Sequence, residues 1–422
     1  MKLHWLFLVS AGIGIGALAA DAADWPQWRG PDRTGISQET GLLKEWPEGG
    51  PKLLWQTNDL GGGYSTPSIV GERLYLISNE GNEAEFVRAL GVADGKEIWS
   101  TKIGKVGKPD QNPPYPGSRS TPTVDGDLIY ALSSDGDLVC LETSTGKIRW
   151  QKHLPRDFGG ESGVWAYSES PLIDGAKLIC TPGGSEATVV ALDKTTGEVL
   201  WKFASPEADQ AAYSSPVIVE AAGVRQYVQL LQKGLVGLDA TSGKLLWRYD
   251  GSVQGSMANI PTPVAYKQLI YSASGRGGGG TVKIDTAQGT VEAEEVYHSP
   301  RLPNSIGGTV EISGNLYGTN RQGLMCVDFA TGEIQWQDRA IGPGSLCSAD
   351  GRLYIHGESG EVALVEATPE AYRELGRFTP PDQPDRGRSK AWAYPAIANG
   401  RLYLHDFGTL WCYDINESGA AE

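Results

Sequence analysis

Short apolar runs alternate with polar, glycine-containing turns along almost the whole chain. One class of run ends in an acidic residue. It reads LVCLE at 138–142, VVALD at 189–193, LVGLD at 235–239, LMCVD at 324–328 and LWCYD at 410–414. Apolar runs of this length between turn residues are typical of buried β-strands. The pattern predicts an all-β protein.

A second phrase follows these runs: a turn that ends in glycine, most often Thr-Gly or Ser-Gly, with a tryptophan four residues further on. The tryptophans are Trp99, Trp150, Trp201, Trp247 and Trp336, and a decayed copy ends at Ala293 instead. Repetition of one phrase about every 45 to 50 residues indicates a repeat architecture.

Each repeat also opens with a proline-marked strand and continues, through a tight turn, into a strand with an aromatic residue eight positions after the proline. Pro122 with Tyr130 and Pro395 with Tyr403 are examples. Turn pairs such as Asp125-Gly126 suit two-residue hairpins. Together with the apolar run and the tryptophan strand, this makes four antiparallel strands per repeat, which is the blade of a β-propeller.

The two ends of the chain set the number of blades. The last repeat stops after LWCYD, where its fourth strand should begin, and Lys52-Leu53-Leu54-Trp55 matches residues 244–247 letter for letter. We therefore predict a ring closed by an N-terminal strand, which leaves no open sheet edge. The fourth-strand positions are Trp55, Trp99, Trp150, Trp201, Trp247, Ala293, Trp336 and a degenerate one near Phe378, giving eight blades. The tryptophans are predicted to be structural wedges between blades.

These residues resemble the pyrroloquinoline-quinone (PQQ)-type propeller repeat over about residues 24–415. Two kinds of protein share the tryptophan-docking phrase: quinoprotein alcohol dehydrogenases, and non-enzymatic propellers similar to the periplasmic lipoprotein of the outer-membrane β-barrel assembly machinery. The opening DWPQWRGP at 24–31 resembles secreted bacterial propellers of this class. The resemblance implies the fold and leaves the activity open.

The dehydrogenase alternative implies PQQ, a Ca²⁺ held by carboxylate and amide oxygens, and a catalytic Asp. Trp392, Glu169 and Asn259 are candidates, but no contiguous motif fixes them, and the chain has no adjacent Cys-Cys pair. Three of the five cysteines, Cys140, Cys326 and Cys412, share one third-strand position and are expected to be buried core residues. We expect no cofactor, and keep PQQ/Ca²⁺-dependent oxidation of alcohols or sugars as the alternative.

The first residues have the pattern of a secretory signal peptide: one Lys, an apolar run, then small residues. We expect a signal peptide over 1–22, a single propeller domain over 23–416 and a tail over 417–422. The protein is then exported, periplasmic or secreted, with no membrane span after cleavage, and is expected to be monomeric. A net charge of −15 argues against nucleic acid as a partner.

Ring symmetry brings the entrances of all first strands to one mouth of the central channel. The position three residues before each strand-opening proline lies at these entrances, and it is filled by Tyr64, Arg119, Ser168, Tyr213, Ile260 and Trp392. Candidate ligand-binding residues there are Tyr64, Arg119, Trp165, Tyr213, Asn259, Arg276, Arg321 and Trp392. For each residue just upstream of a first strand a packing role is an equally good explanation. For the arginines of the loops and turns, solvated surface charge is the favoured alternative.

We expect no catalytic residue and no metal site, because the chain has no HExxH, nucleophile elbow or CxxC. His356 and His405, on neighbouring repeats, are expected to be satisfied histidines between blades. The expected function is a binding or scaffold protein that presents the loops at the mouth to a protein segment or small ligand.

Overall fold

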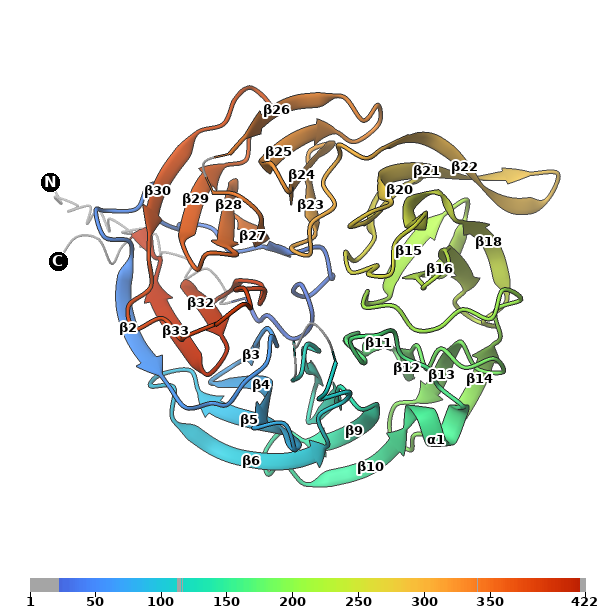
Figure 1. Ribbon diagram of the computed structural model, residues 1–422, viewed down its shortest axis with the longest axis horizontal. Helices are drawn as coiled ribbons and strands as arrows, with labels where there is room; N and C mark the ends of the chain where they lie inside the picture. Colours follow the sequence, from blue (N-terminus) through green and yellow to red (C-terminus); the bar gives the residue numbers. More distant parts are fainter. Residues whose placement is uncertain (1–22, 112–114, 116, 340, 418–422) are drawn as a thin grey trace, which may run out of the picture.

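The chain folds into eight β-sheets arranged in a ring around a central axis (Figure 1). The computed structural model describes residues 23–111, 115, 117–339 and 341–417. The predicted signal peptide, 1–22, and residues 418–422 of the predicted tail lie outside the described residues. The predicted all-β, eight-bladed propeller is confirmed.

Each blade is a four-stranded antiparallel meander, with its first strand nearest the axis. Blade 1 is β3 (Ser68–Val70), β4 (Arg73–Glu80), β5 (Ala84–Gly91) and β6 (Glu97–Gly104); blade 2 is β7 (Thr123–Asp125), β8 (Leu128–Leu132), β9 (Asp137–Glu142) and β10 (Ile148–His153). Blade 3 is β11 (Leu172–Asp174), β12 (Lys177–Cys180), β13 (Val189–Asp193) and β14 (Val199–Phe203); blade 4 is β15 (Val217–Ala221), β16 (Val224–Leu230), β17 (Leu235–Asp239) and β18 (Leu245–Tyr249).

The second half of the ring follows the same order. Blade 5 is β19 (Val264–Tyr266), β20 (Leu269–Ser274), β21 (Gly278–Ala287) and β22 (Thr290–Ser299); blade 6 is β23 (Thr309–Ile312), β24 (Asn315–Asn320), β25 (Gly323–Asp328) and β26 (Ile334–Asp338). Blade 7 is β27 (Gly344–Ala349), β28 (Arg352–Gly357), β29 (Val362–Glu366) and β30 (Glu374–Phe378), and blade 8 contains β31 (Ala396–Ala398), β32 (Arg401–Asp406) and β33 (Thr409–Asp414). A short α1 (Leu154–Phe158) and a 3₁₀ turn, η1 (Gly251–Val253), lie in connections.

The fourth strand of blade 8 comes from the other end of the chain. β2 (Lys52–Thr57) pairs antiparallel with β33, with Lys52 opposite Asp414 and Trp55 opposite Cys412. The predicted ring closure is therefore confirmed, and the last blade has no open edge at β33.

The repeated tryptophans join neighbouring blades. The ring of Trp99 covers Gly146 in the turn of the next blade, where an added Cβ would lie 2.5 Å from the indole. The indole N–H donates to the backbone carbonyl of Thr143 in the same turn, at 3.1 Å. Glycine is required at position 146 for two reasons. Its φ is +70°, and the indole of Trp99 fills the space that a side chain would need. Trp55, Trp150 and Trp336 likewise donate to the next blade, at Val92, Lys194 and Thr368.

The prediction that Ala293 takes the tryptophan position of blade 5 is wrong. Tyr297 lies opposite Thr281 on the third strand, as the tryptophans do in other blades, and its hydroxyl donates to the carbonyl of Phe329 at 2.9 Å. The strands β21 and β22 are ten residues each and project from the ring (Figure 1), so Ala293 lies beyond the docking position.

Blade 7 also differs from the repeat. The residue at its docking position is Gly376, opposite Leu364, and not an aromatic. An added Cβ there would meet the Cβ of Trp46 at 2.6 Å. Trp46 belongs to the N-terminal segment and packs on Phe378 with ring centroids 5.1 Å apart. A tryptophan from outside the repeat therefore fills this blade.

All five cysteines are free and buried. Cys140, Cys326 and Cys412 each lie opposite the docking tryptophan of their own blade, Trp150, Trp336 and Trp55 respectively. They are small core residues beneath the indoles, as predicted.

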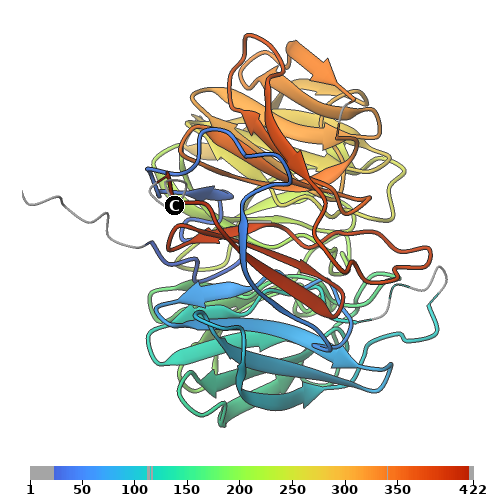
Figure 2. The same ribbon diagram turned by 90° about the vertical axis from the view of Figure 1, so that its left-hand side faces the viewer.

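Residues 24–39, here called the N-terminal strap, cross one end of the ring. Trp25 and Ile69 of blade 1 exchange two backbone hydrogen bonds at 2.8 Å, and the Pro26 carbonyl accepts from Val124 of blade 2. Arg33 donates to the carbonyls ahead of the first strands of blades 3 and 4. The strap lies at the opposite end of the ring from residues 105–111 and 117–120 (Figure 2).

The strap reaches the other four blades as well. Trp28 donates to Thr262 of blade 5 at 2.9 Å, and Arg29 donates to the carbonyl of Thr309 in blade 6. The short strand β1 (Ile36–Ser37) pairs in parallel with β27 of blade 7. The carboxylate of Glu39 accepts from Gly400 of blade 8 at 2.8 Å. One short segment therefore bonds to all eight blades.

The docking geometry predicts unequal effects of two substitutions. Trp201→Ala removes an indole that lies over Gly243 of the next blade, and should lower the free energy of unfolding by about 3 kcal/mol. Ala293→Val, outside the docking position, should change it by less than about 1 kcal/mol. Urea unfolding followed by tryptophan fluorescence measures both. Equal destabilisation by the two would contradict the assigned docking positions.

Candidate functional site

A cavity of about 340 Å³ opens at the mouth of the channel. It is lined by Trp28, Tyr64, Tyr115, Arg119, Trp165, Ser168, Tyr213, Ala258, Ile260, Ile306, Trp392 and Tyr394. Seven of these twelve residues are aromatic, one is cationic, and none carries a carboxylate. We call this cavity the axial cup.

Six lining residues occupy one position of the repeat, three residues before the proline that opens a first strand. They are Tyr64, Arg119, Ser168, Tyr213, Ile260 and Trp392. The prolines mark equivalent points of the repeat, and the six side chains ahead of them line one cavity. Seryl hydrogen bonds fix adjacent entrances: Ser65 Oγ donates to the Ser120 carbonyl, and the backbone N–H of Ser170 donates to Ser215 Oγ.

The N-terminal strap closes the cup from below. Trp28, on the strap, meets Tyr394 with ring centroids 4.6 Å apart, and both residues line the cavity. The Tyr394 hydroxyl donates to the carbonyl of Ile306 at 2.7 Å. These two residues therefore give the cup an aromatic floor.

The aromatic walls are held in fixed orientations. Trp392 packs against Tyr64 and Tyr115, with centroids 5.2 and 5.0 Å apart, and its indole N–H donates to Glu358 at 3.0 Å. On the opposite wall the backbone N–H of Trp165 donates to the Tyr213 hydroxyl at 3.1 Å. Rigid aromatic faces of this kind bind ligands with little loss of side-chain entropy.

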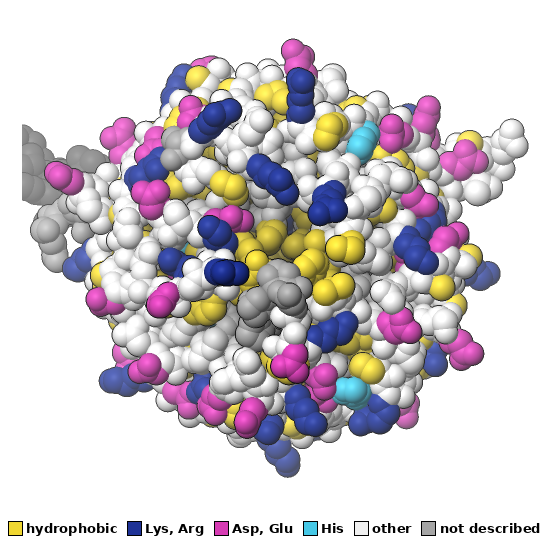
Figure 3. Space-filling model, viewed as in Figure 1, with side chains coloured by type: hydrophobic (Ala, Val, Ile, Leu, Met, Phe, Trp, Pro, Cys, Tyr) yellow, Lys and Arg dark blue, Asp and Glu magenta, His cyan; other side chains and the backbone are white. Residues whose placement is uncertain are grey.

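A second cavity of about 390 Å³ adjoins the cup and shares four lining residues with it: Trp165, Ala258, Ile260 and Ile306. Arg276 and Arg321 line this outer part, and both are exposed. Figure 3 shows apolar side chains gathered at the centre of this face, with Lys and Arg side chains around them. The outer cavity therefore forms a cationic rim to the cup.

Of the eight residues predicted for the mouth, the structure brings five into the cup and two into its rim. Asn259 lies elsewhere: it is buried, and its amide group donates to the carbonyls of Leu231 and Gln232 at 2.9 Å. Its backbone carbonyl accepts from Tyr213. Asn259 therefore does not line the cavity. It stabilises the wall by hydrogen bonding its own loop to the loop of Leu231 and Gln232.

The sequence reasoning missed Trp28, Tyr115, Ala258, Ile306 and Tyr394. Tyr394 had a usable signal, since it directly precedes the strand-opening Pro395. No sequence signal indicated Trp28, because its position in the cup depends on the path of the strap across the channel.

The cup does not fit the PQQ and Ca²⁺ pair that the resemblance allowed. Its described lining offers neither the carboxylates nor the amide oxygens that Ca²⁺ requires. The candidate Glu169 accepts from the backbone N–H of Thr181, and Asn259 lies behind the wall. No two cysteines are adjacent in the chain.

Two buried carboxyl groups lie beside the channel. Burial raises the pKa of Glu85 to about 7, although Ser134 donates to it through both its hydroxyl and its backbone N–H. Burial likewise raises the pKa of Glu169 to about 7, opposed by its bond from Thr181 and by the nearby Arg33. Both groups favour the neutral form because the protein interior solvates a charge poorly.

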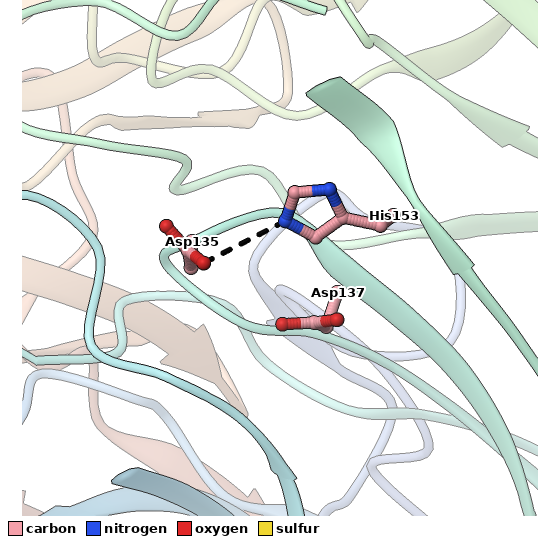
Figure 4. A group of neighbouring side chains, drawn as sticks. All are labelled: Asp135, Asp137 and His153. Carbon is pink, nitrogen blue, oxygen red and sulfur yellow. Dashed lines mark ion pairs between the residues drawn. The ribbon is translucent and has the colours of Figure 1, made fainter. Parts of the chain in front are cut away.

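Among the described residues, one group has the spacing of metal ligands: Asp135, Asp137 and His153 (Figure 4). The group is partly exposed and engaged in other contacts. His153 Nε2 lies 3.6 Å from Asp135, and Asp137 accepts from Gln151 at 2.9 Å. Exposed acidic groups are common without a bound ion.

His356 and His405 are fully buried on neighbouring blades. The Nδ1 atoms lie 3.3 Å from the Ala393 carbonyl and 2.6 Å from the Ser65 carbonyl, respectively. Burial lowers the pKa of both. Each therefore bonds a loop of the next blade.

The family model described as "Outer membrane protein assembly factor BamB" matches residues 83–338, more than half of the chain. A curated quinohemoprotein alcohol dehydrogenase, ADH IIB of Pseudomonas putida, is 25% identical over 64% of this chain and 37% of its own length. The outer membrane protein assembly factor BamB of Xanthomonas campestris is 25% identical over 37% of this chain and 33% of its own. The matches thus span about a third of these relatives.

Solved structures share the fold. BamB of Moraxella catarrhalis has a TM-score of 0.62 at 15% identity, covering 86% of this chain and all of that one. Quinohemoprotein alcohol dehydrogenase of Comamonas testosteroni has a TM-score of 0.51 at 14% identity, covering 93% and 80%. Within the described residues, no helix has the length and apolar character needed to cross a membrane.

The buried Glu169 predicts an unusual dependence of stability on pH. A carboxyl group whose pKa is raised from 4.5 to about 7 on folding stabilises the fold below pH 4.5, and this contribution is lost as the pH rises to 7. Glu169→Gln keeps an oxygen for the Thr181 N–H and removes the charge. The variant should match the parent protein at pH 4 and be more stable by about 3 kcal/mol at pH 8.

Urea unfolding at the two pH values measures this difference, with the exposed Glu198→Gln on the same blade as a control. A Glu169→Gln variant that is less stable than the parent at pH 8 would show that the buried group is needed as a carboxylate.

Proposed function

The chain belongs to the family described as outer membrane protein assembly factor BamB, and we propose that it is a non-catalytic binding module that holds a protein segment or small ligand in its axial cup. The observation that carries the proposal is the cup itself: a cavity of about 340 Å³ whose lining comes from the strap and from seven of the eight blades, with seven aromatic residues among its twelve. Cavities of this size, apolar with few polar groups, are typical ligand sites.

The arrangement of side chains supports binding rather than catalysis. The described lining holds one cation, one seryl hydroxyl and several tyrosyl hydroxyls, and no carboxylate or histidine that could act as a general base. Ser168 has no histidine partner among its described contacts. A site without a base or metal ligands favours holding a molecule over transforming it.

The predicted signal peptide supports a location outside the cytoplasm. In that setting we propose that the cup receives its ligand from the exported fraction of the cell, and that the cationic rim of Arg276 and Arg321 attracts ligands with negative charge.

Site-specific photo-crosslinking tests the proposal. A diazirine analogue of leucine placed at Ile260, on the wall of the cup, should form a defined adduct with a cellular ligand or protein segment, identified by mass spectrometry. The same analogue at Leu200, half exposed on the outer strand β14, is the matched control and should form none. Adducts only at Leu200 would place the binding surface on the outer faces of the blades.

Reconstitution tests the oxidoreductase alternative in the same preparation. With PQQ and Ca²⁺ added, we expect no dye-linked oxidation of ethanol or glucose. Turnover together with stoichiometric binding of the quinone would overturn the non-catalytic proposal.

A further inference from the structure

The cup contains one charged group, the guanidinium of Arg119. It lies among aromatic rings, with its central carbon 5.7 Å from the centroid of Tyr64. It donates to two backbone carbonyls of its own loop, those of Gly117 at 3.0 Å and of Tyr115. These bonds use two of the five N–H groups of the side chain, and hold the guanidinium against the wall of the cavity.

No carboxylate among the described residues forms an ion pair with Arg119. Glu358 is the one carboxylate of the rim cavity, and it accepts the indole N–H of Trp392. Glu85 lies near enough to interact electrostatically with Arg119, but both its oxygens accept from Ser134. Burial lowers the pKa of Arg119, which reflects the cost of a charge in apolar surroundings. A bound anion would offset that cost.

The other lining residues of the cup indicate what kind of molecule would carry the anionic group. Trp28, Trp165 and Trp392 present aromatic faces, and Ile260 and Ile306 fill the spaces between them. A volume of about 340 Å³ accommodates one bulky side chain and a short connecting group. A flat or bulky apolar group packs well against such walls.

The lining also discriminates against a positive charge. A free amino acid would bring its ammonium group into a cavity that has no described carboxylate to receive it, next to the guanidinium of Arg119. An acylated nitrogen, as in a peptide bond, carries no charge and avoids this repulsion. An unpaired buried ammonium is costly.

We propose that the axial cup binds a carboxylate attached to one bulky aromatic or apolar group, with the carboxylate on Arg119 and the body among the tryptophans. The C-terminal residue of a polypeptide has this chemistry, and so does a free aromatic acid. This inference rests on the proposed function, because it assigns a ligand class to the same cavity. Charge-assisted bonds from arginine to carboxylate are strong and directional.

Calorimetric titration of the purified protein tests the proposal. N-acetyl-phenylalanine should bind, and its amide, in which an uncharged carboxamide of similar shape replaces the carboxylate, should bind at least about tenfold more weakly. Free phenylalanine should also bind more weakly than the acetylated acid. Equal affinity for the acid and the amide would overturn the proposal, and this comparison needs no variant.

Two substitutions of Arg119 and one control substitution test whether the carboxylate of the ligand binds to Arg119. Arg119→Gln should remove the preference for the acid over the amide, and Arg119→Lys should keep part of it. Arg388→Gln changes an exposed arginine of the loop that leads to Trp392, outside the lining of the cup, and should leave the preference unchanged. An unaltered preference in Arg119→Gln, or its loss in Arg388→Gln, would contradict the assigned contact.

Further probes distinguish a polypeptide C-terminus from a free aromatic acid. They also distinguish failure of the proposed ligand class from failure of the proposed function. Acetyl-Gly-Gly-Phe binding more tightly than 3-phenylpropionate indicates a polypeptide terminus, and the reverse order indicates a free aromatic acid. Crosslinks at Ile260 together with equal affinity for acid and amide would refute only the ligand class. The absence of both crosslinks and probe binding would refute the proposed function as well.

Discussion

Closure of the ring is the constraint on which the rest of the structure depends. Blades in a propeller contact only their neighbours, so a ring built of such contacts is held together no better than its weakest junction. In this chain residues 24–57 supply a second set of bonds. β2 completes the sheet of blade 8, and the strap ahead of it bonds to every blade at one end of the axis. Within that strap, the side chains of Arg29 and Arg33 reach backbone carbonyls of three different blades. The strap thereby crosses the channel at this end, and its Trp28 contributes to the floor of the cup.

The sequence predicted the fold well where structure follows from a repeated local pattern. The phrase ending in tryptophan identified docking positions such as Trp99 and Trp150 because the turn glycine and the indole must fit each other. It failed at Ala293, since the longer hairpin of blade 5 moves the docking position to Tyr297. It could not identify Trp46, because that residue fills blade 7 from a segment outside the repeat. Hairpin length and contacts from outside the repeat are not encoded in the repeated phrase.

The same distinction holds for the candidate site. The position three residues before each strand-opening proline correctly brought Tyr64, Arg119 and Trp392 to one cavity, since ring symmetry places equivalent positions together. Asn259, one residue ahead of that position, has its side chain turned into the wall. The floor was not predictable, because Trp28 reaches it only through the tertiary path of the strap.

The strap and β2 also constrain the order of events during biosynthesis. They are among the first parts of the propeller to leave the ribosome, yet Trp55 pairs with Cys412, more than 350 residues later. Until then the early blades have neither a closed ring nor the strap's bonds to the later blades, and their strand edges need protection from other chains. Such distant pairing also makes folding slow, because the chain loses the entropy of a very large loop before the closing contacts form. The native state is therefore reached only after translation is nearly complete.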